Sequence, residues 1–235
     1  MEHPPPTVQL PLAIRWNDAA SFDSFHAAGN RQALAAVERL LTGSEGCVYL
    51  HGASGTGKSH LLQAASRCFG ADGAPVAYVP LGQNLCLSPE VLHGLETLQL
   101  VALDDLGAVA CKPAWEEGVF HAFNRMRDTG TRVLLSASAR PEAIGFQLPD
   151  LVSRLQWGLM ERLSPMDDEQ KLGALRHRAR LRGLDLPLDV GRYLLRRQPR
   201  DTTSLFRLLE VLDRAALAEQ RRLTIPFLRR VLGHG

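Results

Sequence analysis

Eight consecutive residues near the start of the chain have the types and spacing that binding of a nucleoside triphosphate requires. Their sequence is Gly-Ala-Ser-Gly-Thr-Gly-Lys-Ser at positions 52–59, the pattern of a phosphate-binding loop whose glycine-rich turn aims backbone N–H groups at phosphate oxygens. In this pattern Lys58 reaches the terminal phosphates and the Ser59 hydroxyl coordinates Mg²⁺. The residues expected to bind nucleotide here are Gly52, Ser54, Gly55, Thr56, Gly57, Lys58, Ser59 and His60.

The segments on either side of this loop favour the phosphate-binding interpretation over a plain glycine turn. An apolar run, Val48 to Leu50, precedes the loop, and an amphipathic helix-like run beginning near Leu61 follows it. This strand, loop and helix order places the positive end of the helix dipole at the phosphates. We therefore expect ADP or ATP, with Mg²⁺, as the cofactors.

A second acidic element completes the expected site. Asp104 and Asp105 follow the apolar run at positions 100–103. A carboxylate at this place is expected to hold Mg²⁺ through water, which is the role expected for Asp104. Asp105 could orient or deprotonate the attacking water. Acidic pairs after strands are common, and only the phosphate-binding loop about 50 residues upstream gives this pair a specific meaning.

Short apolar runs alternate with helical patterns over the first two thirds of the chain. Such alternation predicts an α/β fold with a parallel sheet flanked by helices. A longer stretch carries an apolar stripe at helical spacing that should pack on the sheet. The strand-like runs are 47–50, 76–79, 100–103 and 133–135, and the helical stripe is 113–129.

The sequence pattern changes after Pro165, where helical patterns follow one another without a strand signal. Acidic residues open the first helix, and basic residues followed by Gly183 close it, as helix dipoles and caps favour. We expect an extended proline-rich tail over 1–16, an α/β nucleotide-binding base over 17–164, and a small all-helical lid over 165–235.

Composition excludes several classes of protein. The 235 residues are 45% hydrophobic and carry a formal net charge of +2, which argues against disorder and gives no global field for nucleic acid. The four cysteines form no metal-ligand or disulfide pattern, so a reducing cytoplasm fits. The sequence contains neither a signal peptide nor a membrane-spanning run, and we expect no membrane partner.

The motif set resembles AAA+ ATPases, and more narrowly the family of the bacterial initiator DnaA and its regulatory relative Hda. The segment Leu151 to Gly158 is similar to the initiator segment that carries an arginine finger. The resemblance implies that Arg154 would point at a nucleotide held by a neighbouring subunit and stabilise transition-state charge there. Residues 176–183 and 223–227 also look like the Hda lid, and the resemblance runs from about Gln9 to Leu232.

The sequence departs from this family at two nucleotide-sensing positions. Thr203 stands where the lid of the family carries its sensor 2 arginine, and either Arg200 or Arg207 could turn toward the same face. Polar sensing after the fourth strand falls to Ser136 or Ser138. Weak intrinsic hydrolysis at most, or a preference for the diphosphate, is therefore expected.

The two ends of the chain and one arginine-rich stretch indicate possible partners. Gln9, Leu10 and Leu12 resemble the short peptide by which Hda docks on the β sliding clamp of DNA polymerase III; an incidental tail is the alternative. The chain stops at Gly235 without the helix-turn-helix domain of DnaA, so origin recognition is not expected. The arginines of 176–180 lack interleaved aromatic residues and indicate a solvated helix face rather than strong direct DNA binding.

Taken together, these features predict a negative regulator of DNA replication initiation. It would bind adenine nucleotide, dock on the β sliding clamp, and present Arg154 to ATP-bound DnaA, whose hydrolysis it would stimulate in trans. One rival is a AAA+ accessory loader or adaptor for another replication protein, which would not need Gln9 or Leu10. Another is an autonomous ATPase or small-molecule kinase, for which no acceptor pocket is evident. A homo-oligomer remains open.

Overall fold

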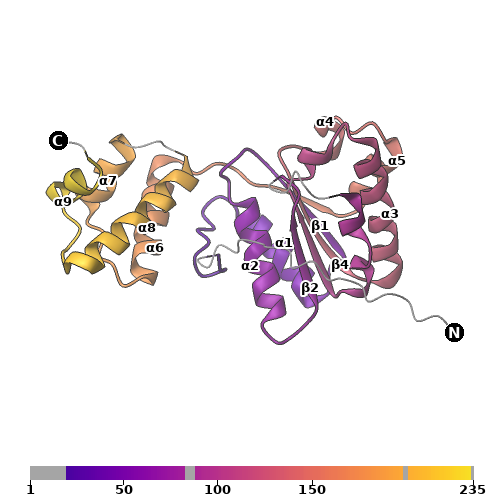
Figure 1. The fold of residues 1–235 in the computed structure, drawn as a ribbon, viewed down its shortest axis with the longest axis horizontal. Coiled ribbons are helices and arrows are strands. Elements are labelled where there is room, and N and C mark those ends of the chain that lie inside the picture. Colours follow the sequence, from indigo (N-terminus) through magenta and orange to yellow (C-terminus); the bar gives the residue numbers. More distant parts are fainter. Residues whose placement is uncertain (1–19, 83–87, 198–200, 234–235) are drawn as a thin grey trace.

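The computed structural model describes residues 20–82, 88–197 and 201–233. Five strands in these ranges form one parallel sheet in the order β2-β3-β4-β1-β5 (Figure 1). The expected α/β fold is thereby confirmed, and four of its strands lie where the apolar runs predict them. The strands are β1 (Cys47–His51), β2 (Val76–Pro80), β3 (Leu100–Asp104), β4 (Arg132–Ala137) and β5 (Leu159–Arg162).

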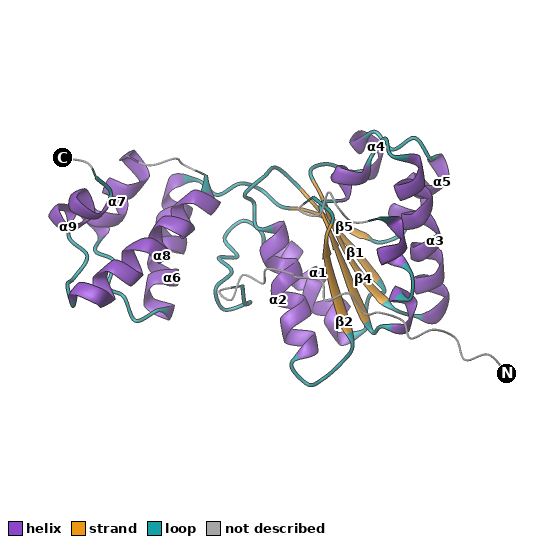
Figure 2. Cartoon of the chain, viewed as in Figure 1, coloured by secondary structure: helices purple, strands orange, loops and turns teal. Residues whose placement is uncertain are grey.

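Helices cover both faces of this sheet, as Figure 2 shows. On one face α1 (Arg31–Thr42) and α2 (Lys58–Gly70) bury aliphatic side chains such as Leu40 and Leu61 against the strands. On the other face lie α3 (Pro113–Thr129), the short α4 (Pro141–Ile144) and α5 (Pro149–Leu155), with Phe123 and Leu151 in the core. The inner strand β3, between β2 and β4, is buried at every residue because both faces of the sheet are covered.

Four helices beyond the sheet bury a separate apolar core and form the lid. The first, α6 (Asp168–Leu181), begins with a capping box in which Asp167 and Gln170 exchange hydrogen bonds. The other three are α7 (Leu188–Arg197), α8 (Thr202–Glu219) and α9 (Ile225–Val231). An α/β base with an all-helical lid is therefore present, and no helix among the described residues could cross a membrane.

The arginine-rich stretch of α6 differs from its expected form. Arg178 is only 4% exposed, and its guanidinium lies 4.3 Å from the centroid of the Phe206 ring on α8. The expectation of a solvated helix face is therefore wrong for this residue. Packing a delocalised cation on an aromatic ring compensates for part of the lost hydration. Arg178 thus joins two lid helices, while Arg180 remains exposed.

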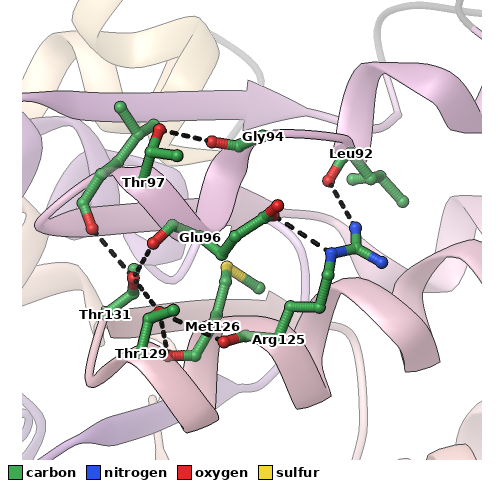
Figure 3. A network of polar contacts seen from close by, with 9 residues as sticks. Leu92, Gly94, Glu96, Thr97, Arg125, Met126, Thr129 and Thr131 are labelled. Carbon is green, nitrogen blue, oxygen red and sulfur yellow. Dashed lines mark hydrogen bonds and ion pairs between the residues drawn. The ribbon is translucent and has the colours of Figure 1, made fainter.

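A polar network ties the C-terminal end of α3 to the turn before β3 (Figure 3). Arg125 Nε lies 3.2 Å from Glu96 Oε2, and Arg125 Nη2 donates to the Leu92 carbonyl. The Thr131 hydroxyl donates to the Glu96 and Leu98 carbonyls at 3.1 and 2.9 Å. These contacts fix α3 at the end of the sheet where the strands begin. The phosphate-binding loop lies at the other end, beyond the carboxyl ends of the strands.

Candidate functional site

The phosphate-binding loop (residues 52–59) joins β1 to α2 at the carboxyl end of the central strands. Three of its glycines have positive φ, which lets the chain turn tightly enough to point N–H groups inward. At Gly52 the need is also steric, since an added Cβ would lie 2.3 Å from the Leu163 carbonyl oxygen. At Gly57 it would lie 2.9 Å from the Phe25 ring. The glycine spacing is therefore required by both conformation and packing.

The lysine of the loop is held over the loop itself. Lys58 Nζ donates to the Gly52 carbonyl at 2.7 Å and to the Ala53 carbonyl at 2.9 Å. Burial lowers the pKa of Lys58, and the negative charges of Asp104 and Asp105 oppose that shift. The ammonium group is therefore close enough to both carboxylates for their charge to affect its pKa. The loop between β1 and α2 and the end of β3 thus contribute to one site.

The other loop residues fall into two groups. Thr56 is buried and its hydroxyl donates to the Ala53 carbonyl at 2.9 Å, so its side chain supports the turn. Ser54 and Ser59 are exposed at the loop surface, and Gly55 lies between them. The Ser59 hydroxyl at the first turn of α2 is therefore available to a metal ion, while the Thr56 hydroxyl is engaged.

His60 points away from the loop toward the segment that precedes α1. Its Nε2 lies 2.9 Å from the Ser21 carbonyl and 3.2 Å from the Ser24 hydroxyl, and its ring lies near Phe25. Burial lowers the pKa of His60 to about 4, although the contact with Ser21 opposes this shift. His60 therefore anchors the segment 21–25 to α2.

We expect His60 to make stability depend on pH. The folded pKa of about 4 lies below the ordinary 6.5, so the unfolded chain binds a proton first as pH falls. The neutral ring therefore contributes its full stability at a pH above its ordinary pKa. This contribution is lost as the pH falls toward about 4. Between about pH 7 and about pH 5 the loss should be about 2 kcal/mol.

Urea unfolding at the two pH values measures this dependence, and His60→Gln is the matched variant because it cannot titrate. The variant should lose most of the slope that His60 contributes. An equal slope in the variant and the parent would show that other groups cause the acid sensitivity.

The acidic pair at the end of β3 separates into a buried and an exposed carboxylate. Asp104 is 4% exposed, accepts from the Tyr78 hydroxyl at 2.7 Å and accepts from the Ser136 hydroxyl. Asp105 is exposed, with a left-handed backbone at φ 62°, and its N–H donates to the Ser136 hydroxyl oxygen at 2.9 Å. The pair thus consists of one buried, hydrogen-bonded carboxylate and one accessible carboxylate.

A chain of buried hydrogen bonds runs through the fixed carboxylate. Gln63 on α2 donates to the Tyr78 hydroxyl at 3.0 Å, and Tyr78 in turn donates to Asp104. Burial and the neighbouring Asp104 charge raise the pKa of Tyr78, so the phenol stays protonated and remains a donor. We define Gln63, Tyr78, Asp104 and Ser136 as the Asp104 network. Of these, sequence reasoning identified Asp104 and Ser136 but missed Tyr78 and Gln63, whose polar groups lie within apolar patterns.

The lid approaches the phosphate-binding loop at the start of α8. A Cβ built on Gly55 would lie 4.0 Å from the backbone nitrogen of Thr202. Thr203, at the expected sensor 2 position, is exposed in the first turn of this helix, and Arg207 is exposed one turn further on. Arg200 lies outside the described residues. A second contact joins lid and base where His177 Nε2 meets the Asp23 carbonyl at 2.5 Å.

Arg154 lies near the end of α5, across the sheet from the lid (Figure 1). Its guanidinium carbon is 5.2 Å from the ring centroid of Trp157, whose side chain is 65% exposed. Arg127 contacts the same ring at 4.5 Å. Within the described residues no carboxylate pairs with Arg154. The remaining expected residues, Gln9, Leu10 and Leu12, lie outside the described ranges.

Comparison with known proteins places this geometry in a class. Domain III of the Thermotoga maritima replication initiation protein DnaA has a TM-score of 0.78 at 21% identity, over 94% of this chain and 98% of that one. AMPPCP-bound DnaA from Aquifex aeolicus gives 0.69 at 23%, over 88% and 71%. The Thermotoga maritima RuvB branch migration motor gives 0.66 at 16%, over 91% and 71%. The chain therefore has the AAA+ fold of these proteins.

Two family models give the narrower assignment. The model described as the bacterial DnaA ATPase domain matches residues 90–162, which include the acidic pair and α5. The model described as the Hda lid domain matches residues 168–232, which include all four lid helices. Together the two matches support an Hda-like, DnaA-related AAA+ protein, as the resemblance of its motifs predicts. Its family context is the regulation of replication initiation.

Proposed function

We propose that this chain binds an adenine nucleotide with Mg²⁺ at the phosphate-binding loop. Support comes from the positive-φ glycines, from Lys58 beside Asp104 and Asp105, and from the exposed Ser59 hydroxyl. Ser59 would hold the metal directly and Asp104 would hold it through water, with the metal neutralising phosphate charge. The AMPPCP-bound DnaA structure shows a nucleotide in a protein of the same fold.

Calorimetric titration with ADP and with ATP, each with Mg²⁺, tests this site. Because Thr203 replaces an arginine beside the loop, we expect ATP to gain little affinity over ADP. A marked preference for ATP would show that another group, such as Arg200 or Arg207, contacts the terminal phosphate. The absence of binding by either nucleotide would reject the proposed site.

The activity that the arrangement supports best is stimulation of hydrolysis of DnaA-bound ATP. The observation that carries this proposal is Arg154, which lies on a short helix remote from the chain's own lid and pairs with no carboxylate among the described residues. An arginine supplied in trans stabilises the charge that develops on a transferred phosphoryl group. The chain would thereby inactivate DnaA and act as a negative regulator of replication initiation in the bacterial cytoplasm.

The deciding experiment reconstitutes DnaA-ATP, clamp-loaded DNA and this protein, and measures release of phosphate from DnaA. Hydrolysis should rise well above that of DnaA alone and should require both the protein and the clamp. The proposal fails if the protein leaves the rate of DnaA unchanged while it binds nucleotide normally.

We further propose that residues 9–12 dock on the β sliding clamp. Gln9 would make polar contacts, and Leu10 and Leu12 would enter an apolar groove. Removal of residues 1–16 should abolish clamp binding in a pull-down, while the charge-neutral substitution of Gln9 by alanine should weaken it. Undiminished clamp binding after truncation would instead favour an accessory loader or adaptor that uses another surface.

Trp157 should matter for the same activity because its indole packs against Arg154. Cation–π contacts at exposed sites contribute about 0.5–1 kcal/mol, so Trp157→Ala should lower the maximal stimulated rate about threefold. Trp157→Phe keeps an aromatic face and should retain more of the rate.

Leu217→Ala provides the control, since it removes an exposed apolar side chain from α8 of the lid. Rates measured at saturating protein separate loss of guanidinium orientation from loss of affinity. Equal rates for Trp157→Ala and the parent would indicate that the indole does not orient Arg154.

A further inference from the structure

A buried carboxylate that takes no part in the nucleotide site lies on α3. Glu116 is only 1% exposed, and its two oxygens accept hydrogen bonds from three backbone N–H groups. Oε1 accepts from Cys111 at 2.8 Å, and Oε2 accepts from Gln147 and Leu148, each at 2.8 Å. Burying a charge is costly unless it is fully hydrogen-bonded, so such a residue has a specific structural task.

The three donors belong to two separate segments. Cys111 closes the turn after η3 (Leu106–Val109), the short helix that directly follows Asp105. Gln147 and Leu148 immediately precede α5, the helix that carries Arg154. Glu116 therefore connects the turn at Cys111, which follows the acidic pair, to the start of α5, the helix that carries Arg154.

The short helix depends on such an external anchor. A seven-residue helix is not stable by itself, and no side chain caps α5 at Leu148. Its buried residues Leu151 and Leu155 pack against the core. Two charge-assisted hydrogen bonds to consecutive N–H groups fix the direction in which the chain enters the helix.

We propose that Glu116 is a positioning residue that sets the direction of Arg154 through α5 and links it to the loop after Asp105. This inference rests on the proposed role of Arg154 toward DnaA-bound ATP. A shift of about 1 Å in a catalytic group can reduce a rate about a hundredfold. An arginine on a misaligned α5 would therefore keep its charge and lose its effect.

The structure offers a variant and a matched control in adjacent positions. Glu116→Gln puts an NH₂ group where an oxygen now accepts. In at least one of the two segments a backbone N–H then meets another donor and loses its hydrogen bond. Glu117→Gln removes the same charge from the exposed face of the same helix. Glu116→Asp keeps the charge but withdraws the carboxylate by one methylene.

Hydrogen exchange of the full-length protein tests the contact without reference to DnaA. In Glu116→Gln and Glu116→Asp the amides of Cys111, Gln147 and Leu148 should exchange at least about tenfold faster, whereas Glu117→Gln should match the parent. Unchanged protection in both Glu116 variants would overturn the proposal at its first step.

Stimulated hydrolysis tests the consequence. Glu116→Gln should lower the maximal rate at least about tenfold with little change in the half-saturating concentration, since the docking surface is retained. A purely structural role would instead also weaken nucleotide binding.

The outcomes separate this inference from the proposed function. If Arg154→Ala removes stimulation and Glu116→Gln leaves it intact despite faster exchange, the positioning role is rejected while the function stands. If Arg154→Ala itself keeps full stimulation, the proposed function is rejected, and the positioning role falls with it. Normal nucleotide binding by Glu116→Gln certifies that the variant is folded.

Discussion

Replacement of Arg154 by alanine should reduce stimulated hydrolysis to the rate of DnaA alone, a loss of about a thousandfold where the assay range allows. The guanidinium would supply positive charge to the phosphoryl group only as the bond breaks, so its loss should lower the maximal rate more than the affinity. Phosphate release from DnaA-ATP on clamp-loaded DNA, at increasing concentrations of the variant, measures both quantities.

Two further substitutions sharpen this result. Arg154→Lys keeps one positive charge but loses the planar fork, and should recover only a small part of the rate. Arg180→Ala removes an exposed arginine from α6 in the lid and should behave as the parent. If Arg154→Ala and Arg180→Ala gave similar rates, general positive charge rather than a directed arginine would account for the activity.

Replacement of Lys58 by alanine should weaken nucleotide binding about a hundredfold. Its ammonium group would make charge-assisted hydrogen bonds to phosphate, each worth about 1.5–3 kcal/mol, and no other lysine of the chain lies in the loop. Calorimetry with ADP and Mg²⁺ measures the change. The free energy of unfolding without nucleotide should fall much less, since the two carbonyls that Lys58 contacts lie in an accessible loop.

Lys171→Ala is the matched control for this experiment. This lysine sits on α6, where it pairs with Asp168 at 3.8 Å, and its removal changes the net charge equally. Its affinity for ADP should equal that of the parent. Undiminished binding by Lys58→Ala would mean that the backbone N–H groups alone hold the phosphates.

The sequence predicts those parts of the fold whose signals are local. The loop glycines, the four apolar strands and the capped helix α6 each follow from residues adjacent in the chain. The edge strand β5 is missed because its four residues, two apolar and then two charged, show no strand period. Its pairing with β1 is created by the tertiary fold.

The site residues that sequence reasoning misses act through long-range contacts. Glu116 and Glu117 are identical neighbours on a helix, and only the fold decides that one is buried against three N–H groups. In the sequence Tyr78 looks like one more apolar residue of a strand, and its polar role follows only from the pairing of β2 with β3. The sequence likewise predicts a solvated Arg178, and only the packing of α8 on α6 places Phe206 against its guanidinium.

The Asp104 network also determines which substitution can be used to study the carboxylate that we propose to hold the metal. Asparagine has the shape of aspartate, but one of its two terminal atoms donates rather than accepts. Turned toward Ser136, that amide would meet a hydroxyl that already accepts from Asp105; turned toward Tyr78, it would meet a hydroxyl that already accepts from Gln63. In either orientation a buried hydroxyl proton loses its acceptor, so Asp104→Asn would disturb the sheet as well as the proposed metal site. An informative variant must change a network partner together with the carboxylate.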